Sequence, residues 1–213
     1  MSSDAVNLWD RPDHARRFLE QRTSYPWRAT AYGELLAWVP PSPRRVLDLG
    51  CGDGEVTARI REAWPLANVV ATDFSDEMLR RAGARFAADP YVEVVRRDLD
   101  EPLPAAWGSF AAVVSAFAIH HVVDERKRAL YAEVFERLEP GGSFVNLEHV
   151  ASATPELHDA WLACLGHTAA DDDPSNKLAP VDEQLSWLRA VGFEQVDCHY
   201  KWREIALLSG VRR

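Results

Sequence analysis

The chain has 213 residues, enough for one sizeable domain with its own core, and its 47% apolar and 27% charged content is that of a globular protein. Its formal net charge of −9 disfavours nucleic acid as a general partner, because phosphate binding needs a positive surface. The sequence shows neither a signal-peptide pattern nor an apolar run near the ~18 residues of a membrane span.

Along the chain, residues 1–40 are predicted to be helical and rich in aromatic side chains. Apolar runs then alternate with helical patterns. We expect three helices in this region: one at 55–64, a second that begins after a capping Ser75, and a third at 124–138. Strands are expected at 46–50, 68–73, 91–98, 110–117 and 143–150. Strands separated by helical patterns of about 10–15 residues indicate βαβ units and a parallel sheet. Ligands bind such sheets outside the carboxyl ends of the strands.

Beyond residue 150, the pattern predicts a helix at 155–168, a long polar connection at 167–180 and a helix at 182–191. The segments 193–200 and 201–210 are expected to pair as two antiparallel edge strands. Long loops in compact domains are usually functional or disordered, so the polar connection is expected near the site. Three widely spaced cysteines form no CxxC pair, which indicates a reduced cytoplasmic protein.

The glycine-rich stretch VLDLGCGDG, at 46–54, carries acids and neither lysine nor arginine. A phosphate-binding P-loop, GxxxxGK[ST], is excluded because the sixth position from Gly50 is Glu55. A dinucleotide fingerprint, GxGxxG, fails because the third glycine comes one place early. A pyrophosphate would also lie beside Asp48 and Asp53, where like charges are costly.

A cationic nucleotide without phosphate suits these acids better, and S-adenosylmethionine is one. The glycines let its amino-acid portion approach the backbone, and Asp48 can attract its ammonium, directly or through water. Asp73 follows Gly54 by 19 residues, close to the ~20-residue spacing at which an acid meets ribose hydroxyls. Asp98 can accept a hydrogen bond from the adenine amino group, while the Leu99 N–H pairs with a ring nitrogen.

Taken in order, these motifs resemble those of the class I S-adenosylmethionine-dependent methyltransferases. VLDLGCGDG matches the glycine motif of that family, ATDFS the second motif, RRDLDEPLP the third, FAAVVSAFAIHHV the fourth, and LEPGGSFVNLEHV the helix–strand turn after it. The resemblance implies a set of cofactor-binding residues: Asp48, Gly50, Cys51, Gly52, Asp73, Phe74, Met78, Asp98, Leu99, Ser115 and Ala116. It implies more weakly that Tyr25 and Arg22 close over the methionine carboxylate.

Four further polar groups follow the ends of neighbouring predicted strands: His120, His121, Glu148 and His149. Such groups can be metal ligands, acid–base groups or hydrogen-bonded structural residues. We predict acid–base groups and no metal. In an extended chain two adjacent histidines point to opposite sides, so we expect His121 and Glu148 to face the substrate and His120 to be packed.

We predict a doubly wound α/β domain over 1–213 with a seven-stranded, mostly parallel sheet. Residues 1–40 form a helical cap, 44–150 the cofactor-binding core, 151–181 the substrate cover, and 182–213 the closing helix and edge strands. The predicted function is direct, in-line methyl transfer from S-adenosylmethionine to a small molecule, leaving S-adenosylhomocysteine. The alternatives are a cyclase-like enzyme on the same scaffold, a non-catalytic cofactor-binding subunit and, more distantly, a nicotinamide oxidoreductase. The sequence does not determine the acceptor, the methylated atom or the oligomeric state.

Overall fold

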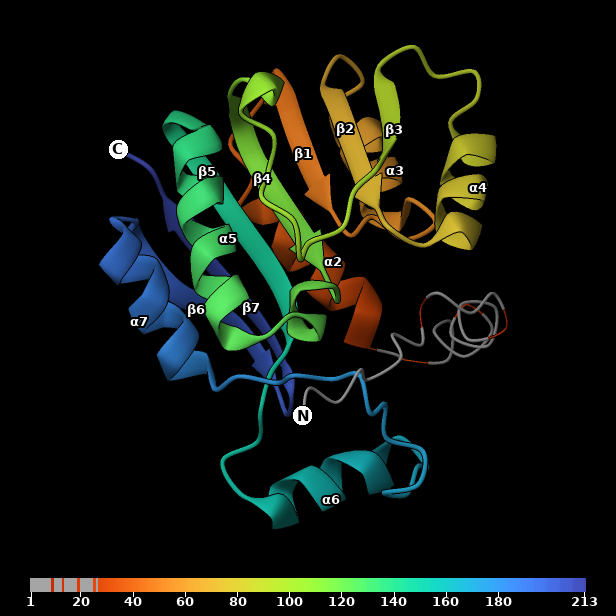
Figure 1. Ribbon diagram of the computed structural model, residues 1–213, viewed down its shortest axis with the longest axis vertical. Helices are drawn as coiled ribbons and strands as arrows, with labels where there is room; N and C mark the ends of the chain where they lie inside the picture. Colours follow the sequence, from red (N-terminus) through yellow and green to blue (C-terminus); the bar gives the residue numbers. More distant parts are fainter. Residues whose placement is uncertain (1–8, 10–12, 14–18, 20–24, 26) are drawn as a thin grey trace.

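The computed structural model describes residues 9, 13, 19, 25 and 27–213 of the chain (Figure 1). Most of the predicted cap at 1–40, including Arg22, therefore lies outside the described residues. The described part of that cap contains helix α2 (Trp27–Ala37). Among the described residues, no helix has both the length and the apolarity needed to cross a lipid bilayer.

Seven strands form one sheet in the order β3-β2-β1-β4-β5-β7-β6. The strands that pair in parallel are β1 (Arg45–Leu49), β2 (Asn68–Asp73), β3 (Val92–Arg96), β4 (Phe110–Ala116) and β5 (Leu138–His149). The last two strands, which run antiparallel to their neighbours, are β6 (Glu194–Trp202) and β7 (Ile205–Val211). The predicted fold class is confirmed. The prediction of two edge strands is wrong for β7, which is buried between β5 and β6.

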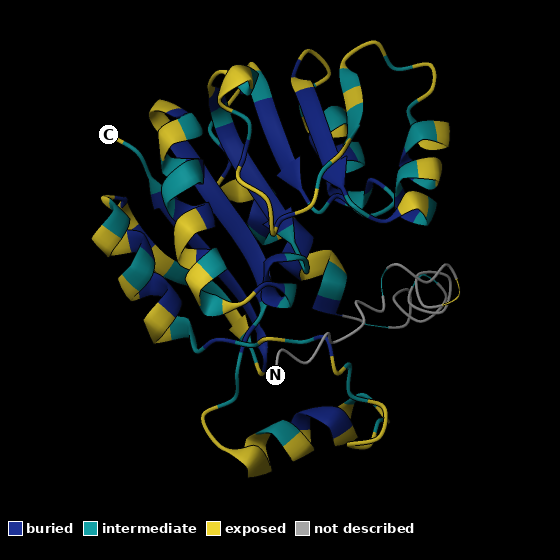
Figure 2. Ribbon diagram, in the orientation of Figure 1, coloured by how far each residue is buried: buried dark blue, intermediate teal, exposed yellow. Residues whose placement is uncertain are grey.

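Helices cover both faces of this sheet (Figure 1). Besides α2 they are α3 (Glu55–Ala63), α4 (Asp76–Arg85), α5 (Asp124–Arg137) and α7 (Val181–Val191). Helix α6 (Pro155–Cys164) lies away from the sheet (Figure 1). One core cluster joins α5 and α7 to the sheet through Leu130 and Leu188, and a second joins α2 and α3 to it through Leu35 and Ile60. Because both faces are covered, most residues of the central strands are buried, which explains their continuous apolar runs (Figure 2).

The loop after β1 turns sharply at three glycines. Gly50, Gly52 and Gly54 have φ of 68°, 56° and 83°, in the left-handed region that side chains disfavour. A Cβ atom at Gly50 would lie 2.1 Å from the Cβ of Ala118, and one at Gly54 would lie 2.4 Å from the ring of Phe86. Glycine at these two positions therefore lets the loop pass close to its neighbours.

Several local predictions differ from the structure. Ser75 occupies the N-cap position of α4, but its side chain makes no capping bond, and its backbone N–H donates to the Asp73 carboxylate at 2.9 Å. Helix α6 ends at Cys164 and not at 168, just before Gly166, which has φ of 74°. Strand β5 begins at Leu138 and not at 143. Leu138 pairs with Phe110 of β4, and the register between the two strands shifts after this pair.

Candidate active site

A first cavity opens at the carboxyl ends of β1, β2 and β4, beside the glycine loop. The predicted cofactor residues that line it are Gly50, Cys51, Gly52, Asp73, Phe74, Met78, Asp98, Leu99 and Ala116. Sequence analysis missed several others, among them Trp9, Tyr32 and Arg97. Trp9 and Tyr32 come from the N-terminal region, which carries no motif that would link them to the glycine loop.

Asp73 lines this cavity and accepts hydrogen bonds from the backbone on either side of it. Its Oδ2 atom accepts the Gly52 N–H at 2.9 Å, and its Oδ1 atom accepts the Ser75 N–H at the same distance. Burial raises the pKa of Asp73, although these backbone donors and Arg96 oppose the rise. A carboxylate has about four acceptor sites, so Asp73 retains acceptor capacity toward the cavity.

Asp48 and Ser115 are fully buried beneath the loop and are not among the residues that line the cavity. The Ser115 hydroxyl donates to the Leu49 carbonyl at 2.8 Å, which joins β4 to β1. Asp48 Oδ2 accepts the Thr57 hydroxyl at 2.6 Å, while its Oδ1 is buried with no partner in the described part of the chain. Burial raises the pKa of Asp48 to about 7. An unpaired buried acceptor costs ~1–3 kcal/mol, which a nearby cation or water would offset.

A second cavity, of about 550 Å³, adjoins the first. Its aromatic walls are Tyr25, Trp27, Phe117 and Trp161. Its polar lining includes His120, His121, His149, Asp171, Asp172 and Asp173. Tyr25 therefore lines this cavity and is not among the residues that line the first one. The polar connection at 167–180 and helix α6 supply much of one wall, as expected for a segment that covers a site.

Trp9, Phe117 and His121 line both cavities and therefore mark their junction. Phe117 has φ of 57°, an uncommon conformation for an aromatic residue, and its ring packs edge-on against Trp27. Such backbone strain persists only where surrounding contacts hold it, and it clusters at functional sites. The two cavities therefore meet at these three residues.

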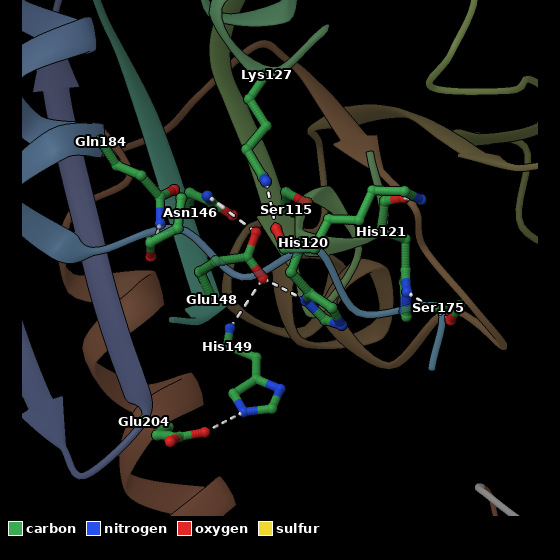
Figure 3. Close-up of polar contacts among 12 residues, drawn as sticks. Ser115, His120, His121, Lys127, Asn146, Glu148, His149, Ser175, Gln184 and Glu204 are labelled. Carbon is green, nitrogen blue, oxygen red and sulfur yellow. Dashed lines mark hydrogen bonds and ion pairs between the residues drawn. The ribbon is translucent and has the colours of Figure 1, made fainter. Parts of the chain in front are cut away.

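Glu148 is fully buried and lies behind His120 (Figure 3). Its Oε1 atom is 2.5 Å from His120 Nδ1 and also accepts the His149 backbone N–H at 2.9 Å. Burial raises the pKa of Glu148 to about 7. The pKa of His120 is lowered, chiefly by burial and to a smaller extent by the charge of the nearby His149. The expectation that Glu148 faces the substrate is wrong, because this carboxylate orients His120, and His120 lines the second cavity.

The chain after β4 is not extended but forms a 3₁₀ turn, η4 (Ile119–His121). The turn brings the ring centroids of His120 and His121 to 4.1 Å, and both rings line the second cavity. The prediction that only one of them faces inward is therefore wrong. His121 Nδ1 lies 3.1 Å from the Ser175 hydroxyl, and its Nε2 is buried without a hydrogen-bond partner in the described part of the structure. Burial, and after it the His120 ring, lower the pKa of His121, so its ring is neutral at neutral pH.

The fourth predicted residue, His149, is held by Glu204 (Figure 3). His149 Nε2 lies 2.8 Å from Glu204 Oε2, and the other oxygen of Glu204 contacts His158 Nδ1 at 3.0 Å and the Ser152 hydroxyl. Glu204 is 1% exposed although it occupies the turn between β6 and β7. A charged residue in a hairpin turn normally faces water, so sequence analysis gave no sign of this role. Within the described residues, no group of three or more His, Cys, Asp or Glu is placed to hold a metal ion.

Comparisons with known proteins agree with this geometry. A family model described as a methyltransferase domain matches residues 46–142. A methyltransferase of Mycobacterium bovis is 36% identical over 147 residues, which are 65% of this chain and 70% of the relative. The demethylmenaquinone methyltransferase of Clavibacter sepedonicus is 34% identical over 176 residues, which are 76% of this chain and 70% of the relative.

Among solved structures, human N-acetylserotonin methyltransferase in complex with S-adenosylmethionine matches with a TM-score of 0.71 at 14% identity. That match covers 100% of this chain but only 60% of the human chain, so the likeness supports the fold alone. The sequence relatives carry the assignment further, since each exceeds 30% identity over most of its own length. The chain belongs to the class I S-adenosylmethionine-dependent methyltransferase family.

Proposed function

We propose that this enzyme transfers the methyl group of S-adenosylmethionine directly to a small-molecule acceptor held in the second cavity. The observation that carries this proposal is the shared junction, where Trp9, Phe117 and His121 line both cavities. The second cavity, of about 550 Å³, has the size and the aromatic walls of a small-molecule site, for which ~300–1,000 Å³ is usual. The name of the Clavibacter relative also gives a small molecule, demethylmenaquinone, as its acceptor.

In this proposal, residues 44–150 supply the cofactor site. The free acceptor sites of Asp73 receive the ribose hydroxyls, and Asp98 with the Leu99 N–H receives the adenine edge, since all these residues line the first cavity. Phe74 and Met78 flank the adenine ring, and the loop from Gly50 to Gly52 lies along the amino-acid portion. The unpaired Asp48 oxygen beneath this loop attracts the ammonium through the electrostatic field. When bound, the cofactor supplies an electrophilic methyl group on a sulfonium.

Residues 151–181 cover the acceptor in the same proposal. Trp161 and the acidic run 171–173 come from this segment and line the second cavity together with the histidine turn. Holding the acceptor at the junction in the correct orientation can supply ~7–11 kcal/mol of barrier reduction. Excluding water strengthens the polar contacts inside the cavity. His120, oriented by Glu148, lines the second cavity beside His121 and positions the acceptor in that cavity.

The decisive experiment incubates the full chain with methyl-labelled S-adenosylmethionine and fractionated metabolite pools. The proposal predicts release of S-adenosylhomocysteine together with a product that carries the label, which mass spectrometry then identifies. Turnover without label in the product would favour a cyclase-like enzyme on the same scaffold. Cofactor binding without turnover in any pool would favour a non-catalytic subunit.

A further inference from the structure

The polar loop after α6 is attached to the histidine turn by three contacts. The Lys177 backbone N–H donates to the His120 carbonyl at 2.8 Å, and the Lys177 ammonium donates to the His121 carbonyl at 2.5 Å. The Ser175 hydroxyl contacts His121 Nδ1 at 3.1 Å, as Figure 3 shows. Segments more than 50 residues apart in the sequence therefore fix the backbone and the ring of His121 together.

Ser175 has a second and shorter contact, with Asp173. Its hydroxyl donates to Asp173 Oδ1 at 2.7 Å, and its backbone N–H donates to the same oxygen at 2.8 Å. A hydroxyl carries one proton, and an ionised carboxylate can only accept, so the shorter bond to the carboxylate takes that proton. Ser175 is 7% exposed, so little water competes for the hydroxyl. The serine oxygen therefore presents a lone pair to His121, and Nδ1 of His121 must be the donor.

We infer that Asp173 and Ser175 hold His121 in the tautomer with its proton on Nδ1, which leaves the Nε2 lone pair as the base for an acceptor that bears an O–H or N–H group. The inference rests on the proposed function and deepens it, because it names the acceptor class. Nε2 has no hydrogen-bond partner in the described residues, and His121 lies at the junction of the two cavities. Asp173 and Ser175 act through His121 and are positioning residues.

The step balances as a direct substitution. The acceptor oxygen or nitrogen gives an electron pair to the methyl carbon, and the carbon–sulfur bond breaks with its electron pair left on sulfur. The proton of the acceptor moves to His121 Nε2, which produces an imidazolium and neutral S-adenosylhomocysteine. Asp173 favours the charged ring through its negative charge, so the residue that sets the tautomer also stabilises the cation that forms.

The charged and titratable groups around His121 agree with a neutral starting ring. His120 lies 4.1 Å away between ring centroids, Asp173 and Glu148 face the ring with carboxyl groups, and the Lys177 ammonium contacts the His121 carbonyl. Burial and His120 outweigh the two carboxyl groups. A neutral imidazole has one N–H, so its tautomer is a defined property that can be measured without any acceptor.

The test is a two-bond ¹H–¹⁵N correlation spectrum of the full chain labelled at histidine. His121→Gln identifies the His121 signals among the seven histidines. The expected wild-type pattern is that of the Nδ1–H tautomer. Ser175→Ala and Asp173→Asn should each change the tautomer ratio by about tenfold toward Nε2–H, the effect of one lost hydrogen bond. The matched control is Thr168→Val, which removes a hydroxyl bound to Asp171 in the same loop and should leave the His121 pattern unchanged.

A wild-type spectrum that places the proton on Nε2 would overturn the inference. Because this result needs only the wild-type protein, the inference can be tested even if a variant fails to fold. A folded Ser175→Ala protein that keeps the Nδ1–H pattern would also overturn it. With the acceptor found in the metabolite screen, Ser175→Ala should lower kcat about tenfold with unchanged cofactor affinity. An acceptor that is methylated on a carboxylate has no proton to remove, so finding one would contradict the role of His121 as a base. If the spectrum shows the Nδ1–H tautomer but no metabolite pool is methylated, the proposed function is refuted and the assigned tautomer still holds.

Discussion

Individual side chains in this enzyme have roles that depend on which buried neighbour they contact. Asp73 and Asp48 both follow apolar strand residues, yet Asp73 lines the first cavity and Asp48 lies beneath it. Glu148 and His120 likewise form one unit, in which the buried carboxylate orients the ring that lines the second cavity. Two predictions at this scale follow from these contacts.

Replacing Asp73 should weaken cofactor binding. Asp73→Ala removes the acceptors for the Gly52 N–H and, in the proposed function, for the ribose hydroxyls. Loss of charged hydrogen bonds worth ~1.5–3 kcal/mol should raise the Kd for S-adenosylhomocysteine about ten- to a hundredfold. Isothermal titration calorimetry measures this change. The matched control is Asp76→Ala, an exposed acid three residues later, and equal affinity in both variants would mean that the ribose is held elsewhere.

Removing the Glu148 charge should stabilise the protein at high pH. Burial raises the pKa of Glu148 from its ordinary value of 4.5 to about 7, so the folded state binds this proton more tightly than the unfolded state. Stability is therefore lost as pH rises from 4.5 to about 7, by roughly 3 kcal/mol in all. Glu148→Gln keeps an acceptor oxygen and should abolish this loss. Thermal unfolding at pH 5 and pH 8 should show a higher Tm than wild type only at pH 8.

The control for that measurement is Glu62→Gln, which changes an exposed carboxylate on α3. It should leave the difference in Tm between the two pH values as in wild type. If Glu148→Gln and Glu62→Gln behave alike, the Glu148 carboxylate is not protonated in the folded protein near neutral pH.

Among the elements, helix α6 lies away from the sheet (Figure 1), so side-chain contacts hold it in place. His158 on α6 joins Glu204 at 3.0 Å, in the turn between β6 and β7, to Asp172 at 3.4 Å in the acidic loop. Burial lowers the pKa of His158, but the hydrogen bonds and charges of Glu204 and Asp172 outweigh burial and raise it. The three residues form an ionic connection between the substrate cover and the sheet.

This connection should weaken as pH rises. A histidine with a raised pKa stabilises the folded form fully below its ordinary pKa and loses that contribution as pH passes through the folded value. Hydrogen exchange of α6 and residues 167–180, corrected for the intrinsic rate, should therefore show more protection at pH 6 than at pH 8.5. His158→Gln should remove the difference, whereas His167→Gln, in the same cover, should retain it. If protection in the wild-type protein is the same at both pH values, the connection through His158 does not hold the cover in place.

At the scale of the whole molecule, the cofactor should stabilise the fold, since its proposed site lies at the ends of three central strands. S-adenosylhomocysteine at a hundred times its Kd should add ~2.7 kcal/mol to the free energy of unfolding. For a chain of this length that raises Tm by about 5–10 °C. Differential scanning fluorimetry measures the shift, and NAD at the same concentration should give almost none. An equal shift with NAD would contradict the preference of the acidic glycine loop for a cation.

Much of the fold followed from local patterns. The run VLDLG, the glycines after it and the alternation of strands and helices to residue 149 depend on short-range sequence, because covering both faces of a parallel sheet requires continuous apolar strands. The place of β7 did not follow, since pairing between β5 and β6 is a long-range choice that no local pattern contains. The same limit applied to Trp9 and Tyr32, which reach the first cavity only through tertiary packing.

The sequence by itself determined the family, the βαβ order and the acids at the strand ends, because spacing along one chain controls which residues follow each strand. Only the tertiary structure decided how those residues are used. Glu148 became a buried partner of His120, and a 3₁₀ turn brought His120 and His121 to the same cavity. Ser175 reached His121 across 54 positions, and the orientation of an imidazole depends on such distant hydrogen-bond partners. Burial and hydrogen bonding depend on three-dimensional neighbours, so the chemistry of the site could not be read from spacing alone.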